Sequence, residues 1–522
     1  MSISMPRWFT LALVSLLSLS ALARETEPNR TLIRDVAIVD VKRQVITDHR
    51  DIITDSGRIV VIRPAKPGTV KERKKIDKVV KVYDGSKFFV TPGLVDAHVH
   101  FDLYAWEKQA DDWSIPMYLS SGVTTVRDCA GSHLTLNIRE KIENHAIFGP
   151  RMVIASPFIT SQKVEPGSNV FQVVDAADAR ARVNSFLDMG YDGIKTDSYL
   201  NDDVYYAAAE AAEARKSYLF GHTLGDERNG FGQIFLSQAL DHYRTLEHFG
   251  FAVYDFMQSL QSPYYHNPKV SAGQVGWFAG AYMDFYHGAS LIKLMRAKHG
   301  VISPTFVTEV YDHKMTDNKD KFLAMTIEDF RKDPYGQYLP DYYYDMWTYM
   351  YKNWTWPNPA DPRRAEIVKG LDNSLKLLKM MDDADVSIVA GTDVPARPYL
   401  VAGKSLHEEL ALYRKAGLNP WRVLRTATLN PAKALGLAGM VGEIREGAFA
   451  DLVFTKANPV RDLGALAHPQ GVMTHGDMLT ESFLKILLAR QKEQVRKIPT
   501  PTIRFSRVHV DTPPRFRTFR SR

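Results

Sequence analysis

The stretch Val90-Thr-Pro-Gly-Leu-Val-Asp-Ala-His-Val-His100 decides the fold. Its Pro-Gly pair favours a turn, and the apolar residues that follow are typical of a strand. His98 and His100 lie two residues apart, and because a strand repeats every two residues, both imidazoles leave the same face. Neutral imidazole is the commonest metal ligand, so the pair is a candidate site for Zn²⁺ or a similar ion.

The chain beyond this stretch alternates between strands and helices. Helical patterns include residues 176–189, 203–216 and 406–416. Such alternation predicts an α/β fold with a parallel sheet, and eight units predict a (β/α)8 TIM barrel over residues 93–436. The seven candidate strands after the histidine pair are residues 123–128, 151–156, 193–197, 218–222, 245–249, 301–306 and 387–393.

Short alternating strands flank this central part. Residues 24–92 and 437–480 both have strand character, and we expect them to join as a small β-sandwich domain beside the barrel. Residues 481–522 are expected to form a C-terminal helix followed by a basic tail.

The first 23 residues have the pattern of a secretory signal peptide. Arg7 provides a positive charge, an apolar run extends from Phe9 to Leu19, and Ala21-Leu-Ala23 is a cleavage motif. The run is too short to span a bilayer. Cleavage after Ala23 predicts a secreted or periplasmic protein. The chain has one cysteine, Cys129, which excludes an intramolecular disulfide.

The positive charge of the chain is concentrated at its end. The formal net charge is +6, but residues 496–522 contain eight basic residues and one acidic residue. The remainder is close to neutral, which excludes a basic body built to bind nucleic acid. Two interpretations of the tail stay open, a weak contact with an anionic surface and a solvated, disordered end.

Residues 311–362 form an insertion between the seventh and eighth strands. Loops of this length in compact domains are usually functional or disordered, and an aromatic-rich segment is not typical of disorder. The insertion is either a lid over the active site or a segment packed against its own barrel or the other subunit of a homo-oligomer. Its aromatic residues are Tyr335, Tyr338, Tyr342, Tyr343, Tyr344, Trp347, Tyr349, Tyr351, Trp354 and Trp356.

Four more polar residues end predicted strands. They are Lys195, His222, His248 and Asp393. Barrel enzymes carry their chemistry at the carboxyl ends of the strands, so we expect these four side chains to converge with the histidine pair.

The chain is similar to the amidohydrolase superfamily, in the branch containing imidazolonepropionase and the prolidase-like metallo-dipeptidases. The resemblance extends over roughly residues 30–480, with the pieces in the same order as in that family. The matching pieces are Pro92-Gly-Leu-Val-Asp-Ala-His-Val-His100, Gly122-Val-Thr-Thr-Val-Arg-Asp128, Gly193-Ile-Lys195, Glu247-His248, Gly391-Thr-Asp393, Leu406-His-Glu-Glu-Leu410, Ala427-Thr-Leu-Asn-Pro-Ala-Lys-Ala-Leu-Gly-Leu437 and Gly442-Glu-Ile-Arg-Glu-Gly-Ala-Phe-Ala-Asp-Leu-Val453.

The resemblance implies a centre of two divalent metal ions, usually zinc. His98, His100 and Asp393 would hold the first ion, and His222 and His248 would hold the second. Lys195, carboxylated on its side-chain nitrogen, would bridge both. An ammonium cannot ligate a cation, whereas a carbamate is an anionic oxygen donor. Burial favours the free amine that reacts with CO₂.

The implied activity is hydrolysis of C–N amide bonds in small molecules. Two metal ions would activate a hydroxide for the attack, and Asp393 would also serve as the catalytic acid and base. Dipeptides of the Xaa-Pro type or N-acyl amino acids are the expected substrates, and Arg397 is a candidate contact for a substrate carboxylate. Two alternatives stay open: a cyclic amide, lactone or ester hydrolase on the same centre, and an inactive binding protein associated with the cell envelope.

Overall fold

The computed structural model describes residues 30–101, 112–164, 170–197, 199–223, 236–249, 280–353 and 364–498. The expected signal peptide and the basic tail beyond residue 498 lie outside the described residues, as do Trp354 and Trp356 of the insertion. Among the helices of these described parts, none is long and apolar enough to cross a membrane.

All eight strands expected in the central part are present, although most are shorter than the sequence pattern. They are β6 (Leu94–Val99), β7 (Val123–Asp128), β8 (Arg151–Ile154), β11 (Ile194–Thr196), β12 (Leu219–Gly221), β13 (Tyr243–Glu247), β14 (Val301–Ser303) and β15 (Ser387–Ile388).

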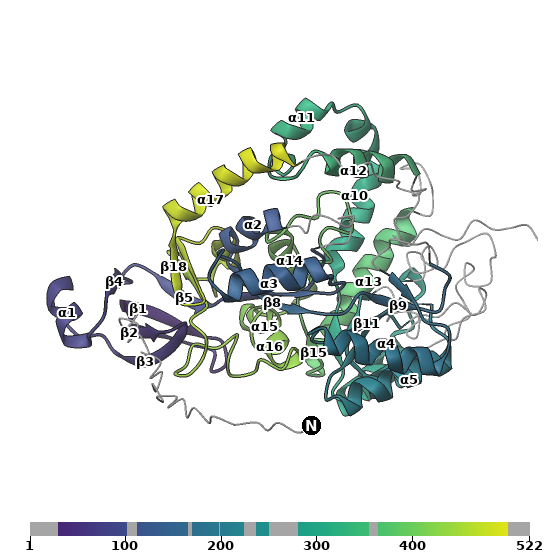
Figure 1. The fold of residues 1–522 in the computed structure, drawn as a ribbon, viewed down its shortest axis with the longest axis horizontal. Helices are drawn as coiled ribbons and strands as arrows, with labels where there is room; N and C mark the ends of the chain where they lie inside the picture. Colours follow the sequence, from purple (N-terminus) through teal and green to yellow (C-terminus); the bar gives the residue numbers. More distant parts are fainter. Residues whose placement is uncertain are drawn as a thin grey trace, which may run out of the picture.

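These strands pair in parallel, which confirms the α/β class and a TIM-barrel-like order (Figure 1). One ladder contains β6, β7 and β8 in that order. The other runs from β11 to β15 in chain order and extends beyond β11 through β9 (Phe158–Thr160) and β10 (Val170–Gln172). Isolated parallel bridges, Ala155 with Gly193 and Val99 with Val394, connect the ladders at both ends.

The expected ranges of the last two strands include residues that a continuous strand does not accommodate. Pro304 cannot donate to a ladder, and Thr305 after it has a positive φ of 51°. Asp393 also has a positive φ, of 59°, so the chain has left extended geometry before this residue. The residues that were expected to finish these strands are irregular, apart from Phe306, which begins α10 (Phe306–Leu323).

Amphipathic helices pack outside the strands. In α5 the residues Val204, Ala208 and Ala212 recur every four positions, so all three are buried on one face. Asp175 caps α4 by accepting from the amide of Asp178. The helices are α2 (Ile115–Ser120), α3 (His133–Glu143), α4 (Ala176–Asp188), α5 (Asp202–Ala214), α6 (Leu236–His242), α9 (Phe285–Ala297), α13 (Arg364–Asp383), α14 (Lys404–Ala416), α15 (Pro420–Thr426) and α16 (Leu429–Ala434).

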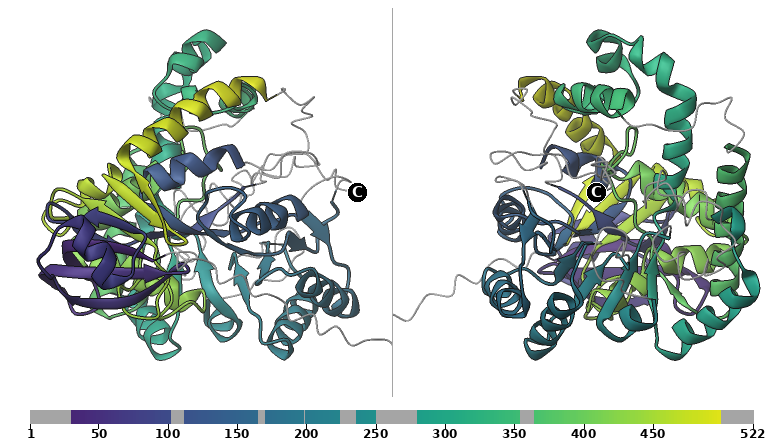
Figure 2. Two further views of the ribbon diagram at one scale, coloured as in Figure 1. Left: turned by 60° about the vertical axis from the view of Figure 1, so that its left-hand side comes forward. Right: turned by 90° about the vertical axis from the view of Figure 1, so that its right-hand side faces the viewer.

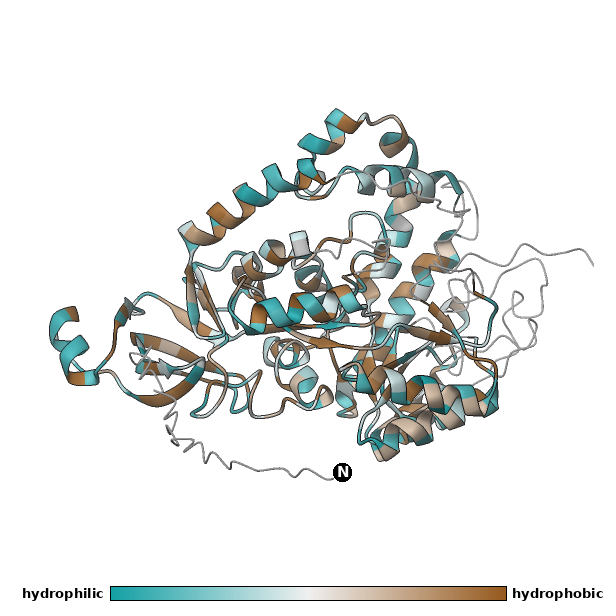
Figure 3. Cartoon of the chain, viewed as in Figure 1, coloured by the Kyte–Doolittle hydropathy of each residue, from teal (hydrophilic) through white to brown (hydrophobic). Residues whose placement is uncertain are grey.

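The main hydrophobic core lies between these helices and the strands. It includes Leu94, Val123, Ile194, Leu246 and Ile302, all essentially inaccessible to solvent. In Figure 3 the central strands are largely hydrophobic, whereas the helices carry both colours. This core fixes the strand ends, and with them the polar side chains that follow.

Strands from the two ends of the chain form one further sheet. Its order is β18-β17-β16-β5-β1-β2-β3, and β4 pairs with β1. The antiparallel pair β5–β16 joins the N-terminal and C-terminal segments. Pairing thus unites them in one eight-stranded sheet, and its folding into a two-layered sandwich stays a prediction. The elements are β1 (Thr31–Asp40), β2 (Val45–Asp55), β3 (Arg58–Pro64), α1 (Val70–Asp77), β4 (Lys81–Asp84), β5 (Phe89–Pro92), β16 (Leu452–Thr455), β17 (Gly471–Thr474) and β18 (Asp477–Thr480).

His475, in the turn between β17 and β18, makes this sheet sensitive to acid. Burial, and then the nearby Arg151, lower the pKa of His475 to about 4, whereas an unfolded histidine titrates near 6.5. Between these values the unfolded chain binds more protons, so the free energy of unfolding falls as the pH drops from about 6.5 to about 4. Above pH 6.5 both states carry neutral histidine and the effect vanishes.

We expect His475→Asn to make unfolding less pH-dependent over that range, by roughly 3 kcal/mol at most. Asparagine tolerates the positive φ of 52° at this position. Urea unfolding at about pH 7 and about pH 4.5 measures the difference. His133→Asn, at an exposed histidine that begins α3, is the control. A pH dependence identical to that of the unaltered chain would contradict the prediction.

The insertion after β14 folds on its own hydrophobic cluster. It contains α10 (Phe306–Leu323), α11 (Ile327–Lys332), η4 (Gly336–Tyr338) and α12 (Tyr342–Asn353). The buried members of the cluster are Met315, Phe322, Phe330, Leu339, Tyr342, Tyr343, Met346, Trp347, Met350 and Tyr351. Trp113 and Tyr399, from loops of the central part, pack against the cluster. The Trp347 and Tyr399 rings are 4.8 Å apart.

The expected C-terminal helix, α17 (Glu481–Gln494), connects the terminal sheet with the insertion (Figures 1 and 2). It begins directly after β18, and Gln491 near its end donates a 2.8 Å hydrogen bond to the Tyr338 carbonyl. In the turn η6 (Val495–Lys497) that follows, Arg496 forms an ion pair with Asp341. These contacts hold the insertion against the body of the protein.

Candidate metal centre

His98 and His100 leave β6 on the same side, as their spacing predicts. Both are buried, and their ring centroids are 5.3 Å apart. Gly391 lets the eighth strand approach them, because a Cβ there would lie 2.6 Å from the Cβ of His98. The glycine of the Gly-Thr-Asp motif is thus required by close packing against the histidine pair.

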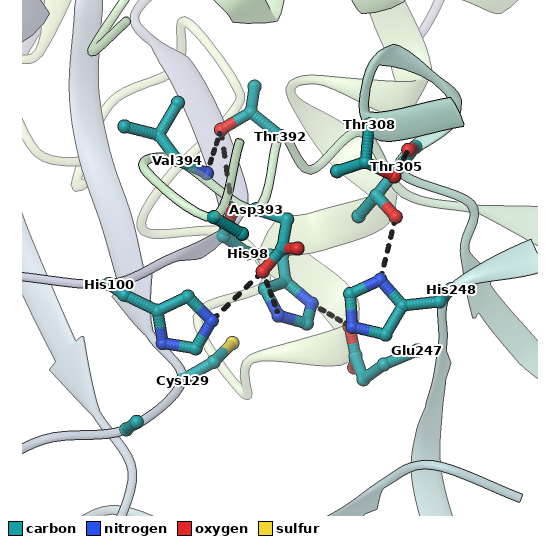
Figure 4. Close-up of polar contacts among 12 residues, drawn as sticks. His98, His100, Cys129, Glu247, His248, Thr305, Thr308, Thr392, Asp393 and Val394 are labelled. Carbon is teal, nitrogen blue, oxygen red and sulfur yellow. Dashed lines mark hydrogen bonds and ion pairs between the residues drawn. The ribbon is translucent and has the colours of Figure 1, made fainter. Parts of the chain in front are cut away.

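Asp393 faces this pair from the loop after β15 (Figure 4). Its Oδ1 atom is 3.0 Å from His100 Nε2 and 3.4 Å from His98 Nε2. Burial alone would raise the pKa of Asp393, but the surrounding histidines hold that pKa well below its ordinary value. The side chain is therefore an anion placed between two imidazoles.

His248 and His222 complete the group from the next strand ends. The ring centroid of His248 is 4.7 Å from that of His98 and 4.9 Å from that of His222. Ligand atoms of His98, His248 and Asp393 all lie within 4.8 Å of one another. Burial lowers the pKa of His100 to about 4 and the pKa of both His222 and His248 well below 6.5. These three imidazoles are neutral at physiological pH, as metal ligands must be.

Lys195 enters the same region from β11. Its side chain is inaccessible to solvent, and its Nζ atom has no hydrogen-bond partner among the described residues. The Phe158 and Phe220 rings lie 5.4 Å and 5.2 Å from Nζ. Burial lowers the pKa of Lys195, and its charge interacts with all four histidines and with Asp393. The structure thus brings the six residues into one site.

Buried polar atoms without hydrogen-bond partners indicate that these side chains fit a metal ion. Within the described part of the chain, Lys195 Nζ and His98 Nε2 are both buried without a hydrogen bond. Buried polar atoms are nearly always hydrogen-bonded, and an unmodified amine in such a place is costly. Several imidazoles and one carboxylate around these atoms are the ligands that zinc-like ions prefer.

A buried ion pair orients His98, and the sequence patterns did not reveal it. Glu247 Oε2 accepts a 2.6 Å hydrogen bond from His98 Nδ1, which leaves Nε2 free to face Asp393. Arg127 donates to Glu247 Oε1 at 2.6 Å and to the Ala97 carbonyl at 2.6 Å. Burial alone would raise the pKa of Glu247, but the charges of Arg127 and His98 hold that pKa well below its ordinary value. A carboxylate that holds a histidine in this way fixes its tautomer.

A second set of contacts orients the His248 ring. Its Nδ1 atom lies 2.8 Å from the hydroxyl of Thr305, the residue with positive φ before α10. The Glu409 carboxylate accepts from the amides of Phe306 at 3.0 Å and Val307 at 2.7 Å. This carboxylate fixes the first turn of α10, and therefore the Thr305 hydroxyl. Glu247 and Glu409 both stand in the matching pieces Glu247-His248 and Leu406-His-Glu-Glu-Leu410, which were the available clue.

Positive φ values cluster at the centre. His248 and Asp393, both named as ligands, have φ of 62° and 59°, and Thr305 has 51°. Such conformations cost energy in residues other than glycine and are concentrated at functional sites. The apolar patterns predicted that these residues end strands. A positive φ turns the backbone, so the patterns could not predict where the side chains point.

Two other residues near the centre have structural partners. Arg397 Nε lies 2.5 Å from Asp312 Oδ1, so an internal carboxylate already balances its charge, and a substrate contact stays a prediction. Cys129 is buried and lies within 4.8 Å of ligand atoms of His98 and Glu247. Because Glu247 is engaged with Arg127 and His98, this trio does not form a separate metal site.

We expect Glu247→Gln to weaken metal binding by roughly 10- to 100-fold, the usual effect of removing the partner that orients a metal ligand. The new amide would place a donor against the Arg127 guanidinium. Titration against a competing chelator measures the affinity. Glu210→Gln, which removes an exposed ion pair with Arg180, is the matched control. Equal affinities in both variants would show that Glu247 has no such role.

The chain is similar to one protein family and to individual known proteins. The sequence model of the amidohydrolase family matches residues 89–479. Ochratoxinase from Aspergillus niger is 32% identical over 113 residues, which cover 21% of this chain and 22% of that protein. The alignment therefore spans less than a quarter of that relative's length.

Solved structures with the same fold cover much more of the chain. A bottromycin amidohydrolase has a TM-score of 0.65 at 20% identity, covering 90% of this chain and 91% of that chain. A Xaa-Pro dipeptidase with bound methionine has 0.59 at 18% identity, covering 86% and 100%. The ochratoxinase of A. niger has 0.57 at 14% identity, covering 87% and 96%.

Proposed function

Because this chain belongs to the amidohydrolase family, we propose that it is an exported, metal-dependent hydrolase of C–N amide bonds in small molecules. The observation that carries the proposal is the convergence of four histidines, a lysine and an aspartate at the ends of parallel strands. In this proposal the two ladders, joined by their isolated bridges, form one eight-stranded barrel around the site.

The proposed centre holds two divalent ions, with zinc as the native metal. His98, His100 and Asp393 would hold the first ion, and His222 and His248 would hold the second. Lys195, carboxylated on Nζ, would supply an anionic oxygen ligand to both, and the proposal is supported by its buried Nζ atom, which has no hydrogen-bond partner among the described residues. When bound, such ions lower the pKa of water and polarise the scissile carbonyl.

The residues of the chain supply orientation and proton transfer. Glu247 orients the His98 ring, and Thr305 orients the His248 ring, through one hydrogen bond each. Asp393 is proposed to accept the proton of the attacking water and to deliver it to the leaving amine. Its Oδ1 atom lies 3.0 Å from His100 Nε2, which places the carboxylate inside the candidate centre.

The proposed substrates are dipeptides of the Xaa-Pro type or N-acyl amino acids. Support comes from the likeness to a Xaa-Pro dipeptidase and to ochratoxinase. A steady-state assay should compare Xaa-Pro dipeptides, N-acyl amino acids and lactones, with chelator-treated enzyme as the control. Hydrolysis of an amide that is lost with chelator and restored by Zn²⁺ is the expected result. Preference for lactones would favour the ester-hydrolase alternative, and no turnover by metal-loaded protein would favour a binding protein.

The insertion is proposed to act as a lid that limits substrate size. α10, which leads into the insertion, begins at Phe306, directly after Thr305, and the Thr305 hydroxyl lies 2.8 Å from His248 Nδ1. We expect Trp347→Ala to loosen the cluster, since large buried aromatics contribute roughly 3–5 kcal/mol, and to raise KM for bulky substrates while metal content stays constant. Phe148→Ala, at an exposed aromatic near α17, is the control. An unchanged KM profile in a folded Trp347→Ala protein would refute the lid.

A further inference from the structure

A cavity lies at the opposite ends of the strands from the metal centre. Its volume is about 390 Å³, and its walls include Tyr243, Val301 and Ser387, the first residues of β13, β14 and β15. The metal-centre residues follow the last residues of these strands. The cavity is therefore separated from the metal centre by the length of the sheet, and its size is within the usual range for small-molecule sites.

Positive charge dominates the lining of this cavity. Two aspartates, Asp382 and Asp385, are the acidic residues of the lining. The cationic side chains of the lining are Arg244, Arg296, Arg422, Arg425 and Lys433. Cations gathered in one concave place repel one another and raise the local potential for anions.

The two carboxylates are already engaged. Arg422 lies 2.8 Å from Asp385 and 3.6 Å from Asp382, and Arg296 lies 3.3 Å from Asp385. Within the described parts of the chain, Arg244, Arg425 and Lys433 have no carboxylate within ion-pair distance. Among the described residues these three cations therefore form no ion pair, although Arg425 lies near enough to Asp385 for the two charges to interact.

Arg244 is held in place by an aromatic side chain. Its guanidinium lies 4.2 Å from the ring centroid of Tyr218, whose side chain is buried. A guanidinium that stacks on a ring keeps its edge N–H groups free to bind an anion. Asn430, also in the lining, donates to the Ile388 carbonyl at 2.8 Å and so stabilises the cavity wall. The cavity is thus a preorganised surface.

We propose that this cavity binds a compact anion with two negative charges, carried by a phosphate group or by a pair of carboxylates. Arg244, Arg425 and Lys433 supply the charge, and arginine provides the paired donors that fit both oxyanions. The site is independent of the metal centre. An anion bound here would offset the repulsion among the three cations and stabilise the ends of β13, β14 and β15.

Calorimetric titration of the full-length protein tests the proposal. The probes are inorganic phosphate and succinate, each at constant ionic strength with chloride as the reference. Saturable binding of phosphate alone identifies a phosphate site, and binding of succinate alone identifies a dicarboxylate site. Saturable binding of neither dianion would overturn the proposal.

Variants locate the binding. Arg425→Gln/Lys433→Gln should weaken it by roughly tenfold or more, since two charge-assisted contacts are lost. Arg490→Gln/Lys369→Gln removes two exposed cations elsewhere and should leave the affinity unchanged. Lys433→Gln alone, at an exposed position, serves if the double variant does not fold. Anion binding at the metal centre would survive the cavity substitutions, and such a result would refute the site. Equal losses of affinity in the cavity double variant and in the control double variant would also refute it.

Discussion

Lys195→Ala is expected to lose nearly all hydrolytic activity and much of its bound metal. Lys195 is the proposed bridging ligand, and its buried Nζ atom has no hydrogen-bond partner among the described residues. Removal of a group that merely orients a ligand costs roughly 10- to 100-fold, so loss of the bridge itself should cost more. Alanine also leaves a small cavity beside Phe158 and Phe220.

Two measurements separate loss of the bridge from loss of the fold. Metal content by elemental analysis should fall together with kcat, while the circular dichroism spectrum stays unchanged. Acetate or formate added to the Lys195→Ala protein should restore part of the rate, because a short carboxylate can occupy the place of the carbamate. Full activity without added carboxylate would exclude carboxylated Lys195 as a bridge.

Asp393→Asn is expected to lower kcat by roughly 10²- to 10⁴-fold, the usual contribution of a positioned acid or base. The amide keeps the size of the side chain but cannot take up the proton of water. It also removes the anion that lies 3.0 Å from His100 and 3.4 Å from His98. KM should change less than kcat, since the lost interaction belongs to the reacting groups.

A pH profile gives this prediction a second readout. The limb of the kcat profile that reports the catalytic base should disappear in the Asp393→Asn protein. Asp383→Asn, at an exposed aspartate of α13, is the matched control and should leave both kcat and the profile unchanged. A folded Asp393→Asn protein with the kcat of the unaltered chain would exclude the proton-transfer role.

The parts of the fold that depend on local periodicity were predictable. The two-residue repeat of a strand placed His98 and His100 on one face, and α4, α5 and α14 lie close to their expected ranges. Alternation of strands and helices indicated the parallel order. Strand ends were less predictable, because Thr305 and Asp393 have positive φ values, which no pattern of apolar residues reports.

The sequence by itself determined the α/β class and the approximate positions of the strands, because both depend on patterns among neighbouring residues. It predicted from the strand ends that six residues converge on one centre, and their roles as metal ligands stay a prediction. Only the tertiary structure decided which groups support them. Glu247 reaches His98 across 149 residues, Arg127 reaches Glu247 across 120, and Glu409 caps α10 across 103. Arg397 meets Asp312 across 85 residues in the same way. Such pairs form because distant elements pack together and because a buried charge needs an opposite charge nearby. Local sequence patterns predict neither of these.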